Sequence, residues 1–470
     1  MMHGDPTYAV VILLVMLAGI SLAGLRAMRG GRGKSSEDYF FGGHSLGWPG
    51  LAGSLFVTLL WCGLCIGVVT GLGSDRLAWS VLALSLAAGL LVLGRIVGPQ
   101  YLSHKSNTLP EFLGGTDSDA GARPIVSGGL LALTVLVRIP LSIVIGVRLM
   151  HAVFGWDFMT SALLLIAVPG LFVVAGGFSS MVAVHEAAAV ATALGFGIGA
   201  LTGSAGFSLE VAGALGVQGV PWFMLLGGML TLALWLTCVD QGIVQRTLAS
   251  RGPDLFRRGA IAASAAVLVA TGTAIVSFLV REPVANSATL QPYLSPLVGA
   301  GIVAAGIAAL SMQFMSAATL TTFDMPWWTR EPGDDATRVL MGRLATTVVV
   351  LVSIVVASFL LVLGDGVIVW LLALYGVLAG PVAGVAAVRY FWMRVHGRAI
   401  VSTLLLMWVL GLFALIVRPA MMTDPASLIW SVTVLVAASV VVLIGATRIL
   451  SPHVPAVPVT FEKRVGAPKV

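Results

Sequence analysis

Several ionisable residues stand inside stretches of the sequence that are otherwise apolar. Arg138 lies near the middle of the apolar stretch 124–149, and His185 and Glu186 lie near the start of the apolar stretch 181–204. Burying such a side chain at membrane depth is costly, so intramembrane charges commonly mark a substrate, ion or proton pathway. These residues are therefore candidate functional residues, and the chemistry open to each depends on the partner it finds.

Arg138 is the most deeply placed of these charges. A guanidinium in the middle of a span, here with Pro140 two residues later, must find an acid, backbone carbonyls or water. Its forked donors suit a carboxylate, so we predict that Arg138 faces a central cavity and pairs with a carboxylate ligand. The alternative is an internal ion pair with a purely structural role.

A second polar group closes the apolar stretch 219–240. Asp240 and Gln241 stand at its end, and Gln245 and Arg246 follow one helical turn later. We predict that these side chains line one end of a central pathway between the helices. The alternative is an interfacial pair of Asp240 with an arginine that only caps the helix.

Two further side chains complete the predicted binding site. Gln313 is a lone amide in the apolar stretch 295–321, and an amide at that depth needs a hydrogen-bond partner. Trp61 lies within the stretch 48–72, where its ring either stacks on a ligand or packs in the core. The predicted ligand-binding residues are therefore Trp61, Arg138, Asp240, Gln241 and Gln313.

His185 and Glu186 are the candidate pair for moving a proton, because histidine titrates near neutral pH. The alternative places both residues at the cytoplasmic interface, where they are solvated or cap the helix start. Cys62 and Cys65 have the spacing C-x-x-C but lack partner ligands, so we expect no metal site and no cofactor. No histidine cluster, serine elbow or phosphate loop accompanies the apolar stretches, so we do not expect an enzyme.

The elements that must position these residues are membrane-spanning helices. Of the 470 residues, 58% are hydrophobic and 10% are charged, and the mean hydropathy is +1.02. Apolar stretches of about 18 residues or more recur along the chain, and each can cross roughly 30 Å of hydrocarbon as a helix. We place about thirteen spans, at 8–26, 48–72, 77–99, 124–149, 158–176, 181–204, 219–240, 260–281, 295–321, 340–364, 366–388, 399–417 and 427–447.

The basic residues test this count, because cytoplasmic loops carry an excess of Lys and Arg. With the N-terminus outside, most basic residues fall in predicted cytoplasmic segments, and the outside loops hold only Arg76, Arg281 and Arg418. The sequence therefore predicts a multi-pass protein of the inner (cytoplasmic) membrane, with its N-terminus outside and its C-terminus inside. The net charge of +6 fits this topology and anionic lipid, so no nucleic-acid partner is expected.

Five stretches, in order along the chain, resemble signature segments of the sodium:solute symporter family, which includes bacterial proline and pantothenate permeases and animal sodium/glucose transporters. They are 37–47 (EDYFFGGHSLG), 108–113 (TLPEFL), 176–182 (GGFSSMV), 240–250 (DQGIVQRTLAS) and 316–324 (SAATLTTFD). The match at 240–250 is the most specific. His44 stands where the family usually has arginine, and Asp240 stands where asparagine is frequent.

The resemblance implies an all-α membrane protein with a leucine-transporter-like core of two inverted five-helix repeats. It divides the chain into an N-terminal anchor helix with its loop, the first repeat, the second repeat, and two additional helices with a cytoplasmic tail. The corresponding ranges are 1–47, 48–204, 205–388 and 389–470.

In this family a sodium ion lies between the first and eighth core helices, held by backbone carbonyls and hydroxyls. The resemblance places the carbonyl donors near Val57 and Leu60 and the hydroxyl positions at Ala308 and Ala309. A methyl group cannot coordinate a hard cation, which takes oxygen ligands. An aspartate that assists the site in some members falls at His185. We therefore expect a degenerate site, at which sodium coupling is weakened or replaced.

One alternative keeps sodium: an alignment shifted by one helical turn would bring Ser311 into the site. Without that shift, H+ or no ion replaces Na+ as the coupling ion. The expected function is a secondary transporter that moves a small organic solute across the lipid bilayer by alternating access. The alternative is a transport-like membrane sensor or partner subunit without active sodium-coupled pumping.

Overall fold

The computed structural model describes the ranges 6–29, 35–69, 76–104, 106–114, 122–202, 222–279, 287–325, 334–363, 367–391, 395–418 and 425–450. Within these residues the chain is helical, and its only β feature is an isolated parallel bridge between Leu46 and Ser250. The described part contains 11 helices that are long and apolar enough to span a membrane, or up to 12 if one bent pair is a single span. The all-helical membrane architecture is confirmed, whereas the count of thirteen stays a prediction.

The helices follow one another along the chain with short helical inserts. In the first half they are α1 (Pro6–Arg29), α2 (Ser36–Phe41), η1 (Gly42–His44), α3 (Trp48–Val69), α4 (Arg76–Val92), η3 (Leu93–Val97), α5 (Gly98–His104), α6 (Leu109–Gly114), α7 (Ala122–Leu133), η4 (Thr134–Arg138), α8 (Ile139–Phe154) and α9 (Phe158–Thr202). In the second half they are α10 (Trp222–Leu234), η5 (Trp235–Val239), α11 (Gln241–Ala249), α12 (Pro253–Leu279), α13 (Ser287–Asp324), α14 (Asp335–Leu363), α15 (Val367–Phe391), α16 (Gly397–Val417) and α18 (Pro425–Leu450).

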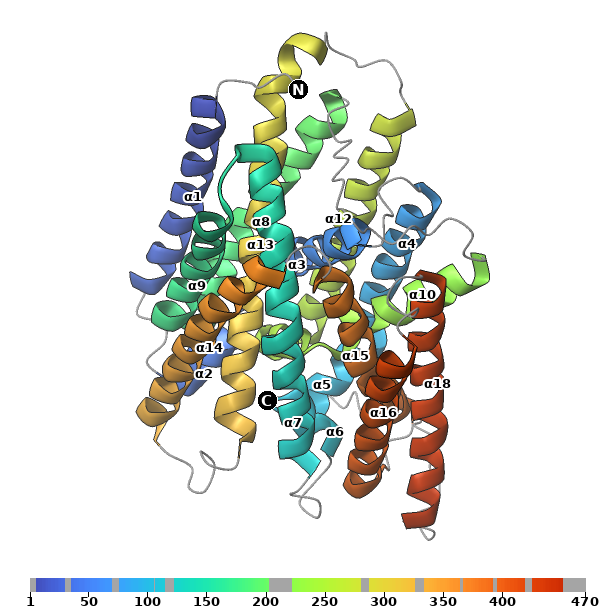
Figure 1. The fold of residues 1–470 in the computed structure, drawn as a ribbon. Coiled ribbons are helices and arrows are strands. Elements are labelled where there is room, and N and C mark those ends of the chain that lie inside the picture. The colour runs from blue at the N-terminus through green and yellow to red at the C-terminus, as the bar shows by residue number, and fades with distance from the viewer. Residues whose placement is uncertain are drawn as a thin grey trace.

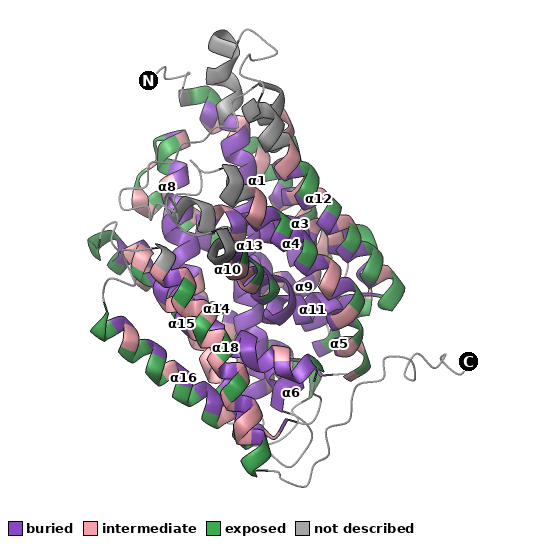
Figure 2. Cartoon of the chain, turned by 90° about the vertical axis from the view of Figure 1, so that its right-hand side faces the viewer, coloured by how far each residue is buried: buried purple, intermediate pink, exposed green. Residues whose placement is uncertain are grey.

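Helix α13 forms the centre of the bundle. In its most apolar window 94% of residues are buried, whereas the corresponding share is 17% for α1 and for α18. Figure 1 shows α1 and α18 at opposite sides of the bundle, and Figure 2 shows α13 and α11 largely buried while α16 exposes one face. Because α13 packs against several helices, among them α3, α7, α8, α9, α11 and α14, its polar side chains must find partners on these neighbours.

Helix α9 has 45 residues, which as one straight helix would extend about 68 Å, more than twice the hydrocarbon thickness. It is broken at Gly177, whose φ of 60° and ψ of −150° are not helical. Glycines on α13 show that the chain reverses there: Gly299 lies against Val153, just before α9, and Gly301 lies against Thr192 near its other end. The predicted spans 158–176 and 181–204 are thus the two arms of α9.

Three short π-helical segments interrupt the bundle: η3, η4 and η5. A π-helical turn contains one extra residue, which changes the direction of the side chains that follow it and is frequent at functional sites. Segment η4 ends in Arg138, and η5 ends one residue before Asp240. These two segments therefore aim the charged residues that the sequence singled out.

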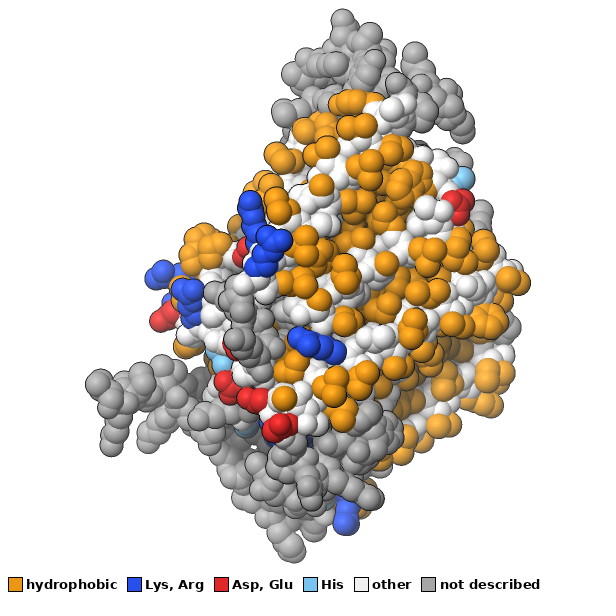
Figure 3. Space-filling view, turned by 90° about the vertical axis from the view of Figure 1, so that its left-hand side faces the viewer, with side chains coloured by type: hydrophobic (Ala, Val, Ile, Leu, Met, Phe, Trp, Pro, Cys, Tyr) orange, Lys and Arg blue, Asp and Glu red, His pale blue; other side chains and the backbone are white. Residues whose placement is uncertain are grey.

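The outer surface is apolar, as a lipid environment requires. Figure 3 shows hydrophobic side chains over most of one side of the molecule, with charged residues gathered toward its margin. Exposed apolar residues of the outer helices include Leu14, Val15 and Leu22 of α1, and Val348 and Phe359 of α14. Part of the topology prediction rests on residues outside the described ranges, namely Arg32, Lys34, Lys105, Arg281, Arg330, Arg394, Lys463, Arg464 and Lys469.

Candidate functional site

The signature stretches meet at one end of the bundle. The segment after α2 pairs with the end of α11: Leu46 N–H donates to the Ala249 carbonyl at 2.9 Å, and Arg251 N–H donates to the Leu46 carbonyl at 3.1 Å. His44 Nδ1 lies 2.6 Å from the Leu248 carbonyl, so the histidine that stands in the usual arginine position is held by backbone. These contacts join residues that lie more than 200 positions apart in the chain.

A closely packed turn fixes the break in α9 at the same end. The Tyr39 hydroxyl donates to the Val173 carbonyl at 3.0 Å, and a Cβ on Gly177 would lie 2.6 Å from the Tyr39 carbonyl oxygen. Only glycine fits there, because the close approach and the positive φ both exclude a side chain. Burial raises the pKa of Tyr39 to about 12, so its hydroxyl keeps the proton that it donates.

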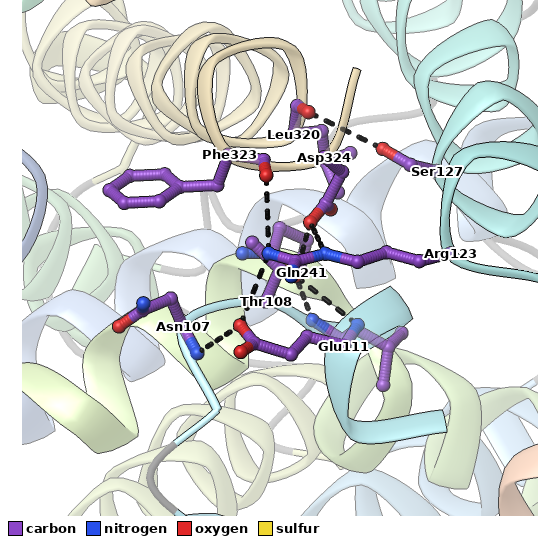
Figure 4. A network of polar contacts seen from close by, with 10 residues as sticks. Asn107, Thr108, Glu111, Arg123, Ser127, Gln241, Leu320, Phe323 and Asp324 are labelled. Atoms are coloured by element: carbon purple, nitrogen blue, oxygen red, sulfur yellow. Dashed lines mark hydrogen bonds and ion pairs between the residues drawn. The ribbon is translucent and has the colours of Figure 1, made fainter. Parts of the chain in front are cut away.

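Below this turn, a polar network links α6, α7, α11 and α13 (Figure 4). We call Thr108, Glu111, Arg123, Gln241 and Asp324 the closing network. Asp324 accepts from Arg123 Nε at 2.6 Å and from the Thr108 hydroxyl at 2.9 Å. Arg123 also donates to Glu111 at 3.3 Å and to the Phe323 carbonyl at 3.1 Å.

Gln241 belongs to the closing network, although the sequence placed it among the ligand-binding residues. Its Oε1 accepts from the Leu109 backbone N–H at 2.7 Å and so joins α11 to the start of α6. The next polar residue of the same helix, Gln245, donates to the Thr319 hydroxyl at 2.5 Å and to the Phe40 carbonyl at 3.4 Å. Both glutamines therefore hold helices together at this end, and the first turns of α11 are wholly buried.

Arg138 and Asp240 form a buried ion pair between η4 and the break after η5. Their side chains are only 13% and 7% exposed. Asp240 also caps α11, because its Oδ1 accepts from the Gly242 N–H at 2.7 Å. The two predicted site residues are thus brought together, and in this structure Arg138 is paired internally by Asp240.

Trp61 and Gln313 converge on one hydroxyl. Trp61 Nε1 donates to Ser142 Oγ at 3.2 Å, and Gln313 Nε2 donates to the same oxygen at 3.1 Å. Gln313 Oε1 is buried and has no hydrogen-bond partner among the described residues. A buried acceptor without a partner is costly, so Gln313 Oε1 is available to a donor from a ligand.

The third polar group surrounds His185, which is completely buried. We call Ser54, Thr58, His185, Arg246 and Ser311 the hydroxyl cluster. His185 Nδ1 lies 2.7 Å from Ser54 Oγ, and Nε2 lies 2.8 Å from Ser311 Oγ. Arg246 donates from Nε to Ser54 at 2.8 Å and from Nη2 to Thr58 at 3.0 Å. The alternative that His185 is solvated at the interface is wrong.

The hydroxyl cluster fixes the tautomer of His185. The Ser311 hydroxyl donates to the Ala308 carbonyl at 2.8 Å, so its oxygen accepts from His185 Nε2–H. Ser54 Oγ accepts from Arg246, and His185 Nδ1 is the acceptor that its own proton reaches among the described residues, so we assign Ser54 as donor to an unprotonated Nδ1. Each hydroxyl then donates once and accepts once, and the assigned ring is neutral. Glu186, by contrast, is exposed, and its carboxylate lies against Gly50 of α3.

The residues that the resemblance assigned to a degenerate ion site lie around the hydroxyl cluster. Ala308 and Ala309 are buried on α13, and Val57 is buried on α3 beside Thr58, whereas Leu60 is partly buried. Ala308 contributes its carbonyl to the cluster through Ser311. The shifted alignment would bring Ser311 into the ion site, which stays a prediction; the structure places Ser311 in the hydroxyl cluster, where its oxygen contacts His185.

Sequence reasoning missed Ser54, Thr58 and Ser142 as partners. Ser54 and Thr58 are four positions apart in α3, which places both hydroxyls on one helix face, and this spacing was the available signal. Ser142 follows Arg138 by four positions in the same way. Without the partner helices, however, a small hydroxyl in an apolar span equally indicates helix packing.

The model of the sodium:solute symporter family matches residues 39–406. The chain belongs to the sodium:solute symporter family. Among curated relatives, the sodium/mannose cotransporter SLC5A10 of Bos taurus is 25% identical over 76% of this chain and 70% of that protein. The sodium/myo-inositol cotransporter 2 of Homo sapiens is 24% identical over 88% of this chain and 70% of that protein.

The fold agrees with that membership. A Na+-coupled sialic acid symporter, solved in a substrate-bound outward-open state, superposes with a TM-score of 0.72 at 16% identity, covering 96% of this chain and 98% of that one. The symporter family thus supports a secondary transporter in a membrane, as the signature stretches implied. A family of solute symporters is also consistent with the expectation that the chain is not an enzyme.

Proposed function

We propose that this symporter homologue moves a small organic solute by alternating access, and that sodium coupling at the site between α3 and α13 is weakened or replaced. The hydroxyl cluster carries this proposal. Ala308 and Ala309 offer methyl groups, and the nearby hydroxyl oxygens of Ser54, Thr58 and Ser311 already accept N–H bonds. A hard cation needs several free oxygen ligands, and these oxygens are engaged.

The solute site in this proposal lies between α3, η4, η5 and α13. It is lined by Trp61, Ser142 and Gln313 on one side and by the Arg138–Asp240 pair on the other. Neutral donors and acceptors beside aromatic rings suit a polyhydroxylated solute, and relatives of this chain are named as mannose, glucose and myo-inositol cotransporters. Such a solute would donate a hydroxyl to Gln313 Oε1.

A carboxylate solute is the second candidate, and Arg138 is the observation that favours it. The Arg138 fork can bind a carboxylate, but Asp240 holds it in this structure. A carboxylate would therefore have to displace Asp240, or bind to donors of Arg138 that Asp240 leaves free. Measuring which of the two solute classes displaces the other from this site decides between the polyhydroxylated solute and the carboxylate.

We also propose that the closing network faces the cytoplasm of the inner membrane. Basic residues surround this end of the molecule: Arg26 and Arg29 end α1, and Arg257 and Arg258 begin α12. Cytoplasmic loops carry such an excess. Labelling a cysteine placed at Arg257 in inside-out vesicles, but not from the outside of intact cells, is the expected result.

The test of the function is uptake of radiolabelled glucose, mannose, myo-inositol and acetate by proteoliposomes. Each solute is presented with an imposed sodium gradient, an imposed proton gradient, and no ion gradient. We expect uptake of at least one solute that sodium does not stimulate. Sodium-stimulated uptake would overturn the loss of coupling, and stimulation by protons would assign coupling to a titratable pair such as His185 and Glu186. Tight binding without uptake would identify a sensor.

A further inference from the structure

Arg246 is a buried cation whose hydrogen-bond partners are neutral. The residue is 2% exposed, and its guanidinium donates to the hydroxyls of Ser54 and Thr58. Both hydroxyls belong to α3, whereas Arg246 belongs to α11, so the guanidinium forms a polar link between these helices. A buried charge in a low-dielectric interior ordinarily has a carboxylate beside it, and here hydroxyls take that place.

The charges near Arg246 do not cancel. Asp240 is the carboxylate of this region in the described part of the chain, and it is already paired with Arg138. His185 contributes no charge in the assigned tautomer, because Ser54 donates to Nδ1 and Ser311 accepts from Nε2. Arg138, Arg246 and Asp240 together therefore carry one net positive charge at the junction of α3, α9, η4 and α11.

We propose that the Arg246 guanidinium is a tethered cation that does, permanently, what a bound monovalent cation would do at this junction: it holds α3 against its neighbours. This inference rests on the proposed loss of sodium coupling and names its cause. The guanidinium engages the hydroxyl oxygens of Ser54 and Thr58, so these oxygens cannot take the place of the ligands that the methyl groups of Ala308 and Ala309 fail to supply. Its charge also repels a second cation at the same place.

His185 makes this arrangement self-consistent. A carboxylate at position 185, as in some relatives by resemblance, would sit beside Arg246 and cancel its charge, leaving the junction able to take a free cation. A neutral imidazole leaves the Arg246 charge uncancelled. A junction with a carboxylate, an arginine and a free monovalent cation carries the same net charge as this junction, which has a neutral histidine and an arginine and no free cation. Histidine at 185 and methyl groups at Ala308 and Ala309 are then one coordinated change.

The test is chemical rescue of Arg246→Ala. The variant is purified in detergent, and its midpoint of thermal unfolding is measured in choline chloride with low millimolar guanidinium chloride, sodium chloride or urea added. We expect the variant to melt below the wild type, and guanidinium to restore about half of the loss or more in a saturable way, as a ligand of the native state does. Urea has the same shape without the charge and should restore nothing.

Three further proteins sharpen the test. Arg246→Lys keeps the charge and should retain sodium-independent uptake. Arg251→Ala removes an exposed arginine one turn further on, which donates to the Ser45 carbonyl, and should not respond to guanidinium. His185→Asp supplies a carboxylate beside Arg246 and should gain a sodium-dependent rise in its melting midpoint, whereas we expect no such rise in the wild type.

Rescue by urea as effective as rescue by guanidinium would overturn the tethered-cation role, as would an Arg246→Ala variant that no cation stabilises. If Arg246→Ala does not fold, His185→Asp decides alone: no sodium response in that variant contradicts the inference. Sodium-stimulated uptake by the wild type would instead contradict the proposed function. The two failures are therefore distinguishable.

Discussion

The hydroxyl cluster and the closing network each hold an arginine that links helices, but they stabilise it in different ways. Arg123 in the closing network is 34% exposed and donates to two carboxylates, Glu111 and Asp324. Arg246 in the hydroxyl cluster is 2% exposed and donates to two hydroxyls. One arginine has charged partners and access to water, and the other has neither.

This difference bears on which region can move. The Arg123–Glu111 pair reaches solvent and can exchange its partner for water at little cost, since exposed pairs contribute about 1 kcal/mol or less, whereas the buried Asp324 holds Arg123 more firmly. A guanidinium sealed among hydroxyls has no water to replace them, and separating it from them costs the full desolvation penalty. We therefore expect the closing network to open during transport while the hydroxyl cluster stays intact.

The largest effect is expected at the Arg138–Asp240 pair. This pair is buried like the hydroxyl cluster, and its charges are balanced as in the closing network. Arg138→Gln leaves Asp240 without its cation, so we expect a loss of about 3 kcal/mol in stability and of most uptake. Thermal unfolding and proteoliposome uptake measure the two effects. The double variant Arg138→Gln with Asp240→Asn should recover part of the stability. Unchanged uptake in the single variant would remove Arg138 from the solute site.

Asp324→Asn tests the charged centre of the closing network. The change leaves Arg123 with only Glu111 as an anionic partner, and the expected loss is about 2 kcal/mol, discounted because a third of Arg123 reaches solvent. A less stable closed end should also raise the labelling rate of a cysteine introduced at Ser127, which donates to the Leu320 carbonyl beside the network. An unchanged labelling rate would show that this network does not keep the end closed.

His185→Leu and His185→Gln form a matched pair for the hydroxyl cluster. Leucine leaves the Ser54 hydroxyl without an acceptor and Ser311 without a donor, for an expected loss of about 1–2 kcal/mol. Glutamine supplies one acceptor and donors, so it should lose less than leucine and preserve uptake. Equal melting midpoints for the two variants would contradict the assigned hydrogen-bond directions. Uptake by the glutamine variant that responds to an imposed proton gradient as strongly as the wild type would exclude proton transfer at this residue.

Glu111→Gln is expected to have the smallest effect. Glu111 and Arg123 are both about one-third exposed and lie 3.3 Å apart, so the pair contributes about 0.5 kcal/mol. The melting midpoint should change little at low salt and not at all at high salt, because salt screens exposed pairs. A loss of stability as large as that of Asp324→Asn would show that the closing network is sealed from water. The closing network would then not differ from the hydroxyl cluster in its access to solvent.

Local sequence features predicted the parts of this site but not their pairing. The apolar stretches predicted where the helices lie, since only helices satisfy their own backbone in lipid. The charges at Arg138, Asp240 and His185 stood out because they interrupt those stretches. Their partners did not: His185 and Ser54 are 131 positions apart, and Ser311 is 126 further on. Nothing in a single sequence measures such separations in space.

Two pairs of adjacent candidate residues have different surroundings in the structure. Gln241 was grouped with the ligand-binding residues because it adjoins Asp240, yet the break of 45° between η5 and α11 turns the two side chains to different partners. Likewise, Glu186 adjoins His185 but lies about 100° around the helix from it, so one residue is exposed while the other is buried. Residues adjacent in sequence can therefore face different partners, because the helix turns successive side chains in different directions.

By itself the sequence determined that this chain is a helical membrane protein of the sodium:solute symporter family, because hydropathy and signature residues are local properties. By resemblance it also predicted that the methyl groups of Ala308 and Ala309 stand where relatives have hydroxyls. Only the tertiary structure decided that Arg246 donates hydrogen bonds to the hydroxyls of Ser54 and Thr58, and that Asp240 forms an ion pair with Arg138. Those outcomes depend on how helices distant in the chain pack, and in a low-dielectric interior the partner of a charge, rather than the charge itself, sets what it does.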